Sequence, residues 1–520
     1  MTQPAPQRFN LVDEPWIPIE DHAGRVQLMS LAATFEHAAR LRRVVDPSPI
    51  VTIALYRLLF AIFHRAYPLA GHDDWLDAWD SGSAHEHVGA YLATWRHRFD
   101  LFAADAPFWQ VPDLDTSPKV MAWTKLAAEL NDNNSKVLFD HTVTLRAEPA
   151  SPERVARALV ACQVMSVGGG NSTIGYTVHA PIATALVVVP EGPTLADTLL
   201  ANVRVGTIPS DRPVWERDPP TADALKAGND AKPVVERPFS GIADRLTWRT
   251  RSLRLVPPED DQGVQSVHFG AGERAAMAEG DRDPWVPYRV SKEGTWLPRR
   301  WDLQRAVWRD LHAMIASKAG ESTAPLVLAD VGALASMADR EVPTWTLLIA
   351  GQAADKAKIN AWSQERWRVP SRLIEGEPGA AHALGEALAR AEATADRLRS
   401  LAWHVAEDSL GVHTAPPKST VRAAMDRLPT LTTYWSVLEA SFAQLLDDLG
   451  HTGVDDPLGT AHRRWTAAIA LAVEQAARDT HRSLGRDAVA IRAWAKTGQR
   501  FAELARQLSR EAQQQPGGSA

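Results

Sequence analysis

Three consecutive glycines, Gly168 to Gly170, precede Asn171 in the segment VGGGNSTIGY at 167–176. Glycine adopts backbone conformations closed to other residues and lets a backbone come close to a ligand, so the segment is a candidate phosphate loop or nucleic-acid contact. A Walker A loop needs a lysine before its serine or threonine, and Gly170-Asn171-Ser172 has none. The spacing of these glycines does not match the dinucleotide-binding fingerprint, which also requires a strand before the glycines, and no strand is expected there. A flexible structural turn is the other interpretation.

A second candidate is the segment at 344–367, TWTLLIAGQAADKAKINAWSQERW. Residues 344–350 are apolar and include Thr, Trp and Ile, which favours a buried strand. From Gln352 to Lys358 there is no large apolar side chain but there are two lysines, and a second segment follows from Ile359. We therefore expect two anchored arms with a small cationic tip between them, suited to an anionic surface. An ordinary exposed turn and a helix beginning near Ala353 are the alternatives.

The sequence contains no HExxH, GxSxG, CxxC or EF-hand pattern. Histidine and aspartate lie closest together at 72–74 and 479–481, and nothing favours a metal site at either place. Cys162 is the only cysteine, which excludes internal disulfides and cysteine-rich zinc sites and suits the cytosol. We therefore expect no enzyme activity, no metal and no cofactor. A nucleotide-using enzyme built on the glycine segment is the alternative, and a nucleotide-induced thermal shift would support it.

The chain has 520 residues, 45% of them hydrophobic, and a net charge of −7. This length corresponds to about two to four domains. The charge excludes a basic nucleic-acid coat, so any contact with nucleic acid must come from local patches. Residues 1–10 lack the pattern of a signal peptide. The apolar stretch 49–70 is interrupted by Arg57, His64 and Arg65, so we expect a buried amphipathic helix rather than a membrane span, and a cytoplasmic protein.

The expected fold class is α+β. Residues 1–376 mix short strands and helices and form a large N-terminal domain. Apolar residues then recur at helical spacing in four stretches, which predicts a C-terminal four-helix bundle over 377–511 and a disordered tail over 512–520. Inside the first domain we expect an irregular segment at 209–238, a loop-like one at 267–288 and a helix at 301–315. Arg249 and Arg251 are expected to be solvated, with a phosphate or partner contact as the alternative.

The first part of the chain carries an ordered series of motifs: FNLVDEPWIPI at 9–19, a turn signal at 21–24, VQLMSL at 26–31, a helical pattern over 31–40, and PFWQV at 107–111. This order resembles the CasA family, the large subunits of Cascade, which is the RNA-guided surveillance complex of type I-E CRISPR systems. EPWIP is the most specific part. The resemblance continues in order through the glycine segment, the 344–367 segment and the C-terminal helices, and 212–290 is its weakest part.

The resemblance implies a non-catalytic subunit that recognises the protospacer-adjacent motif (PAM) of target double-stranded DNA, starts duplex opening and helps to recruit a helicase-nuclease. It implies that the PAM is contacted by the glycine loop, which here is Gly168, Gly169, Gly170 and Asn171. The wedge glutamine of the family falls on Lys356, and the rest of the tip consists of Asp355, Ala357 and Lys358. Gln352 is a possible substitute for the wedge glutamine. The family's lysine finger has no matching lysine between His268 and Val290, and we expect Arg274 in its place.

The segment NDNNSKVLFD at 131–140 matches, by the same resemblance, a long loop that reaches toward the crRNA and neighbouring subunits. The family's Phe-Val-Asn element would fall on Leu138, Phe139 and Asp140, where an aspartate replaces the amide. An ordinary surface loop is the alternative. The implied partners are target double-stranded DNA, the crRNA-containing backbone and small subunits of Cascade, and the helicase-nuclease, with no membrane. The competing function is an α-rich protein-interaction scaffold that makes no direct contact with DNA.

Overall fold

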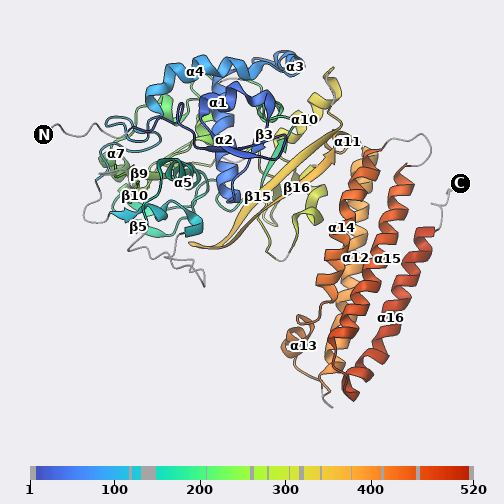
Figure 1. The fold of residues 1–520 in the computed structure, drawn as a ribbon. Helices are drawn as coiled ribbons and strands as arrows, with labels where there is room; N and C mark the ends of the chain where they lie inside the picture. The colour runs from blue at the N-terminus through green and yellow to red at the C-terminus, as the bar shows by residue number, and fades with distance from the viewer. Residues whose placement is uncertain are drawn as a thin grey trace. The chain divides into compact units, whose positions relative to one another are not determined.

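The computed structural model describes residues 8–115, 120–130, 148–206, 208–257, 263–277, 280–303, 305–315, 321–339, 342–375, 378–411, 415–451 and 457–513. The chain divides into two compact units, residues 1–307 with 317–366 and residues 308–316 with 367–520 (Figure 1). The first unit mixes helices and strands and the second is helical, which confirms the α+β class. Leu138, Phe139 and Asp140, and the tail from 514, lie outside the described residues.

The first sheet forms around β1 (Ile17–Asp21), which pairs antiparallel with β2 (Val26–Met29) and with β3 (Leu41–Val44). The Ser30 hydroxyl accepts a hydrogen bond from the amide of Ala33 and so caps α1 (Leu31–Glu36). Strands β1 and β2 thus form a hairpin around the turn signal at 21–24. The helical pattern over 31–40 becomes α1 followed by a 3-10 turn (Ala38–Arg40).

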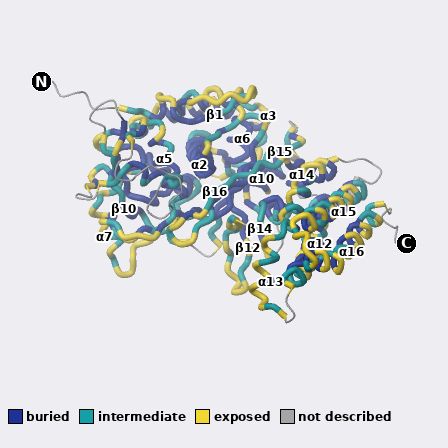
Figure 2. The backbone as a smooth tube through the Cα atoms, turned by 60° about the horizontal axis from the view of Figure 1, so that its bottom comes forward, coloured by how far each residue is buried: buried dark blue, intermediate teal, exposed yellow. Residues whose placement is uncertain are grey.

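The centre of the first unit is α2 (Pro49–Ala66). Among the described residues it is the helix that is long and apolar enough to cross a membrane, but 89% of it is buried inside the fold (Figure 2). Helix α2 is thus a buried core helix, as expected. Tryptophans fill the surrounding core, and those exposed by less than 2% in this unit are Trp16, Trp75, Trp79, Trp215, Trp285 and Trp345.

A three-stranded sheet in the order β16–β15–β7 carries the second sequence candidate. Its strands are β7 (Val187–Glu191), β15 (Thr344–Asp355) and β16 (Lys358–Pro370), and β15 pairs antiparallel with β7. The two long arms confirm the expected pair of anchored segments and exclude a helix beginning near Ala353. The segment before β7 holds α5 (Pro152–Met165), which packs against α2.

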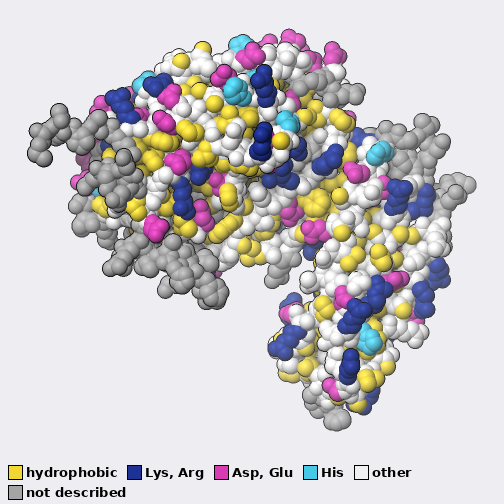
Figure 3. Space-filling model, viewed as in Figure 1, with side chains coloured by type: hydrophobic (Ala, Val, Ile, Leu, Met, Phe, Trp, Pro, Cys, Tyr) yellow, Lys and Arg dark blue, Asp and Glu magenta, His cyan; other side chains and the backbone are white. Residues whose placement is uncertain are grey.

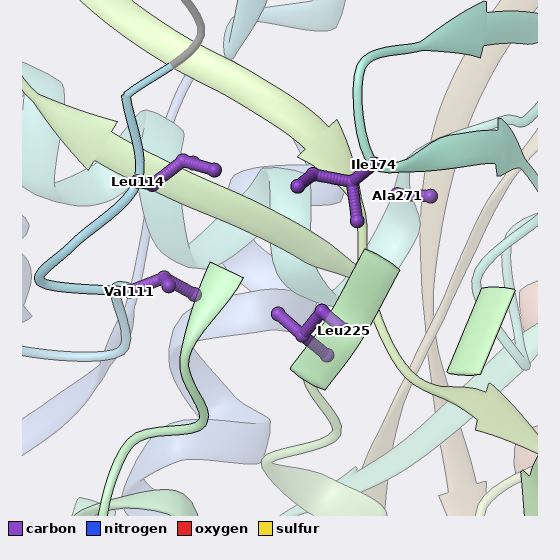
Figure 4. Close-up of a cluster of buried hydrophobic side chains, with 5 residues drawn as sticks. All are labelled: Val111, Leu114, Ile174, Leu225 and Ala271. Atoms are coloured by element: carbon purple, nitrogen blue, oxygen red, sulfur yellow. The ribbon is translucent and has the colours of Figure 1, made fainter. Parts of the chain in front are cut away.

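Two further small sheets lie in the region that the sequence predicts to be loop-like. Strand β10 (Ser266–Ala271) lies between β9 (Arg251–Leu255) and β4 (Met121–Ala122), and β11 (Arg274–Ala275) pairs with β8 (Glu236–Arg237). Helix α7 (Ala222–Asp230) lies within the stretch expected to be irregular. Both expectations were wrong. Ala271 and Leu225 share a small core with Ile174, Val111 and Leu114, which joins these elements (Figure 4).

The first unit also contains further helices and strands. They are α3 (His72–Ser81), α4 (Val88–Trp95), β5 (Gly170–Ser172), β6 (Gly175–Thr177), α6 (Leu195–Ala201), α8 (Ile242–Leu246), β12 (Tyr288–Val290), β13 (Trp296–Pro298), β14 (Ser322–Thr323) and α10 (Leu326–Met337). Of these, α6 and α8 are largely buried.

The second unit is a bundle of four long helices: α12 (Pro378–Ser409), α14 (Thr430–Gly450), α15 (Pro457–Ser483) and α16 (Ala488–Gln513). The short helices α9 (Leu311–Ile315), α11 (Ser371–Ile374) and α13 (Lys418–Met425) accompany them. The helix expected at 301–315 is reduced to a 3-10 turn (Val307–Asp310) and α9. Trp308 is fully buried in this unit, with its ring 4.8 Å from that of Phe442, which accounts for the grouping of 308–316 with the bundle.

Candidate nucleic-acid interface

The tip of the β15–β16 hairpin is a two-residue turn, Lys356 and Ala357. Asp355, Lys356 and Lys358 are exposed and Ala357 is half-buried. Lys356 has a φ of +53°, and hairpin turns of two residues require a positive φ at their first position. Glycine or asparagine usually takes this position, so a lysine there carries a conformational cost of about 1 kcal/mol. The expected cationic tip is therefore present, with Lys356 at its point.

Gln352 holds the hairpin in place and is not part of its exposed end. Its side chain is fully buried, and its amide nitrogen donates to the carbonyls of Met165 and Ala183, the latter at 2.8 Å. A side chain in this position reaches DNA only by giving up both bonds. Gln352 is thus a support for β15 at the end of α5, and we no longer assign it to the DNA contact.

The glycine segment continues into a small hairpin, β5–β6. The Gly168 amide donates to Nδ1 of His179 at 3.2 Å, that of Gly169 to the Thr177 carbonyl at 3.0 Å, and that of Gly170 to the Thr177 hydroxyl at 3.2 Å. All three amides are therefore used inside the protein. A phosphate loop instead directs such amides at its ligand, so the geometry weighs against the nucleotide-using alternative.

Close approach explains why glycines stand here. A Cβ at Gly169 would lie 2.6 Å from the Cβ of Ala357, and the φ of Gly169 is +136°. A Cβ at Gly168 would lie 2.2 Å from the carbonyl carbon of Val178, whereas Gly170 faces open space. The structure therefore brings the two sequence candidates together: the glycine segment touches the tip of the long hairpin at Gly169 and Ala357.

A cleft with a volume of about 230 Å³ lies at this contact. Its lining consists of Met121, Lys125, Val167, the run from Gly168 to Thr173, Thr177, Arg251, Phe269 and Ala357. Asn171 and Thr173 are exposed there and offer an amide and a hydroxyl. On the face drawn in Figure 3, lysines and arginines are interspersed with acidic side chains.

Arg251 lines the cleft but is a structural residue. It is 1% exposed, and its guanidinium donates to the carbonyls of Val178, Thr250 and Val167 at 2.8, 3.0 and 3.0 Å. Burial lowers its pKa to about 10. Arg249 is likewise buried and donates to the Gln110 carbonyl at 2.9 Å. The expectation that these arginines are solvated was wrong, and neither guanidinium is presented to a phosphate.

Arg274 does not line the glycine cleft. Its Nε donates to Oδ1 of Asn229 at 3.0 Å and its terminal nitrogen donates to the Tyr176 carbonyl, so it braces β6 against α7. It borders a separate cavity of about 310 Å³ together with Arg217 and Arg237. Of the residues singled out in the sequence, the structure thus gathers Gly168 to Asn171 with Ala357, places Lys356 and Lys358 beside them, and leaves Arg274 and Gln352 outside.

The bond from Gly168 to His179 predicts a pH dependence of the glycine segment. Partial burial, and after it the charges of Arg251 and Arg300, lower the pKa of His179 below 6.5. His179 therefore takes up its proton at a higher pH in the unfolded chain than in the folded one. The contribution of neutral His179 to the free energy of unfolding is complete above about pH 6.5 and is lost on acidification. A His179→Gln variant, whose amide oxygen can accept from Gly168, should lose less stability than the wild type between pH 7 and 5 in parallel denaturant titrations. Identical pH profiles would contradict this role for His179.

Comparison with known proteins places the whole chain in one group. The family model described as CRISPR-associated protein Cse1 matches residues 10–480. CasA/Cse1 of Thermus thermophilus is 32% identical over 518 residues, covering 97% of this chain and 99% of the relative. A crystal structure of Thermus thermophilus CasA superposes with a TM-score of 0.84 at 30% identity, covering 96% of this chain and 100% of that one.

More distant structures share the fold. Cse1 from Acidimicrobium ferrooxidans gives a TM-score of 0.78 at 25% identity, covering 98% of this chain and 99% of that one. A chain of a structure described as a CRISPR RNA-guided surveillance complex gives 0.73 at 20% identity, covering 98% and 100%. At that identity the likeness establishes the fold alone.

Proposed function

Since this chain belongs to the CRISPR-associated Cse1 (CasA) family, we propose that it is the large, non-catalytic subunit of an RNA-guided DNA surveillance complex and that it recognises the PAM of target double-stranded DNA. The observation that carries the proposal is the contact between Gly169 and Ala357. It sets a cationic hairpin tip beside a cleft with exposed polar groups.

In this proposal the cleft reads the PAM and the tip begins strand separation. Minor-groove contacts mainly separate A·T from G·C pairs, so tolerance of several PAM sequences is natural. A side chain inserted between base steps costs a few kcal/mol of unstacking, which contacts with the bent duplex offset. Lys356 offers donors and a positive charge but no acceptor, so it attracts phosphate or base acceptors and does not reproduce an amide. Pairing between RNA and DNA then supplies the sequence specificity.

The other parts of the proposal concern partners. Family membership supports assembly with crRNA-bearing backbone and small subunits. By family membership, the assembled complex recruits a separate helicase-nuclease, since the chain itself supplies no cutting chemistry in this proposal. A cytoplasmic location follows from the same role.

The test is a Lys356→Ala variant in the complex assembled with crRNA. We expect about tenfold weaker binding of a PAM-containing duplex, equivalent to about 1.4 kcal/mol, and slower opening reported by a fluorescent base beside the PAM. A duplex already unpaired beside the PAM should bind as it does to the wild type, because no opening is required.

A Lys356→Gly variant separates charge from conformation. It removes the same charge, but glycine adopts the positive φ of this position without strain. It should therefore bind DNA as Lys356→Ala does and unfold at a higher temperature than Lys356→Ala. If both variants bind and open the intact duplex at the wild-type level, the tip has no role in opening. The scaffold without direct DNA contact then becomes the better description.

A further inference from the structure

The glycine cleft has a cationic side chain that no sequence pattern singles out. Lys125 ends a 3-10 turn (Trp123–Lys125), is half-buried, and lines the cleft together with the glycines and Ala357. Its ammonium lies 5.4 Å from the centre of the Phe269 ring, a cation–π contact that holds the charge at the cleft. Among the described residues that line the cleft, two carry a lysine or arginine charge: Lys125 and Arg251.

The turn that carries Lys125 is fixed from both sides. The Trp123 amide donates to the Gln265 carbonyl at 2.9 Å, and the Trp123 indole donates to the Glu148 carbonyl at 2.8 Å. The Leu126 amide closes the turn on the Trp123 carbonyl at 2.9 Å. A lysine on so firmly held a backbone delivers its charge to a defined place, which a long side chain on a mobile loop does not.

Arg251, Arg274 and the glycine amides have hydrogen-bond partners in the fold, and the ammonium of Lys125 itself lies over the Phe269 ring. Arg251 is committed to three carbonyls, Arg274 lies on a different cavity, and the glycine amides are bonded to Thr177 and His179. A lysine is a compact point charge with rotatable donors and is well suited to a phosphate oxygen. The cleft therefore combines polar groups for base edges, at Asn171 and Thr173, with the cationic side chain of Lys125.

We propose that Lys125 binds a backbone phosphate of the DNA duplex and so positions the PAM against Gly169 and the hairpin tip. The proposal rests on the DNA-binding function proposed above. Phosphate contacts fix register and orientation without reading sequence. Loss of Lys125 should therefore weaken binding of all duplexes to a similar degree, and it should leave the preference among PAM sequences unchanged.

The experiment measures duplex affinity of the assembled complex over a range of salt concentrations. A Lys125→Met variant keeps an unbranched side chain of similar length and removes the charge. We expect several-fold weaker binding at low salt and a slope of log affinity against log salt that is smaller by about 0.9, the value for one lost phosphate contact. Lys125→Arg should keep the wild-type slope. Lys226→Met removes an exposed lysine of α7 that does not line the cleft and should leave the slope unchanged.

The slope distinguishes a phosphate contact from a packing role, because a merely structural lysine changes stability without changing counterion release. If Lys125→Met unfolds too easily to assemble, Lys125→Gln gives the same readout. A wild-type slope in the charge-free variant, with Lys356→Ala still impaired in opening, overturns the role of Lys125 and leaves the proposed function intact. Unchanged duplex binding in both variants overturns the two together.

Discussion

A Gly169→Ala variant is expected to lose most of the PAM-dependent duplex opening that we propose, although the change adds a single methyl group. The new Cβ would lie 2.6 Å from the Cβ of Ala357, well inside van der Waals contact, and a φ of +136° is one that alanine rarely adopts. The backbone strain alone costs about 1–3 kcal/mol. The clash between the two methyl groups is relieved when residue 169 and the hairpin tip move apart, which removes the alignment of cleft and tip.

Two further substitutions make this prediction specific. Gly170→Ala places its methyl group in open space, so it should leave the thermal unfolding temperature close to that of the wild type. Ala357→Gly removes the other half of the clash, so the double variant Gly169→Ala/Ala357→Gly should recover part of the opening rate that Gly169→Ala loses. A double-mutant cycle on the opening rate measures this coupling. Absence of recovery, with normal thermal unfolding of all variants, would show that the Gly169–Ala357 contact is irrelevant to opening.

The hairpin was predictable from sequence because its signals are local. An apolar run, a polar interval with two lysines and a second ordered segment specify two strands and a turn, and β15 and β16 follow them closely. The glycines predicted close approach of the backbone to a ligand, whereas the structure shows close approach to other parts of the same chain. The partner in that approach was not predictable, since nothing near Gly169 in the sequence indicates that Ala357 lies opposite it in the fold. Lys125 was not predicted as a site residue for the same reason, because segments far apart in the sequence form the cleft that it lines.

The errors also have physical causes. Arg251 was expected in solvent because arginine is rarely buried, but three carbonyls accept hydrogen bonds from the terminal nitrogens of its guanidinium here. Strand β10 was missed because Gly270 and Gly272 suggested a loop, whereas the added Cβ of each would strike Ile174 or the 249–251 backbone. The glycines permit the packing of β10 and do not interrupt it. Composition alone did not distinguish a glycine that breaks a strand from one that permits close packing of a strand.

The largest effect on stability is expected at the ion pair between Arg57 and Asp283. Arg57 lies in the middle of α2, and its two terminal nitrogens donate to the two carboxylate oxygens of Asp283 at 3.1 and 2.8 Å. Both side chains are at most 3% exposed. Asp283 also accepts a hydrogen bond from the amide of Trp285 at 3.1 Å, and the Arg57 guanidinium lies 5.5 Å from the Trp285 ring centre, so the pair ties the segment before β12 to the core helix.

Breaking the pair from either side should leave an uncompensated buried charge. Arg57→Met or Asp283→Asn is therefore expected to lower the free energy of unfolding by about 3–5 kcal/mol, and the double variant by clearly less than the sum. Arg25→Met is the matched control, because its pair with Asp21 is exposed and removal should cost about 0–1 kcal/mol. Urea titrations followed by tryptophan fluorescence compare the four variants with the wild type.

The same pair predicts a response to acid. Burial by itself would raise the pKa of Asp283, but the Arg57 guanidinium outweighs it and holds the pKa below the ordinary value. This stabilisation is therefore present above about pH 4, the range in which an unfolded aspartate is charged, and is lost as pH falls through the lower folded pKa. Asp283→Asn lacks the titrating group, so its stability should fall less steeply below pH 4. An acid profile as steep as that of the wild type, or a neutral-pH loss no greater than that of Arg25→Met, would rule out the pair as a principal support of α2.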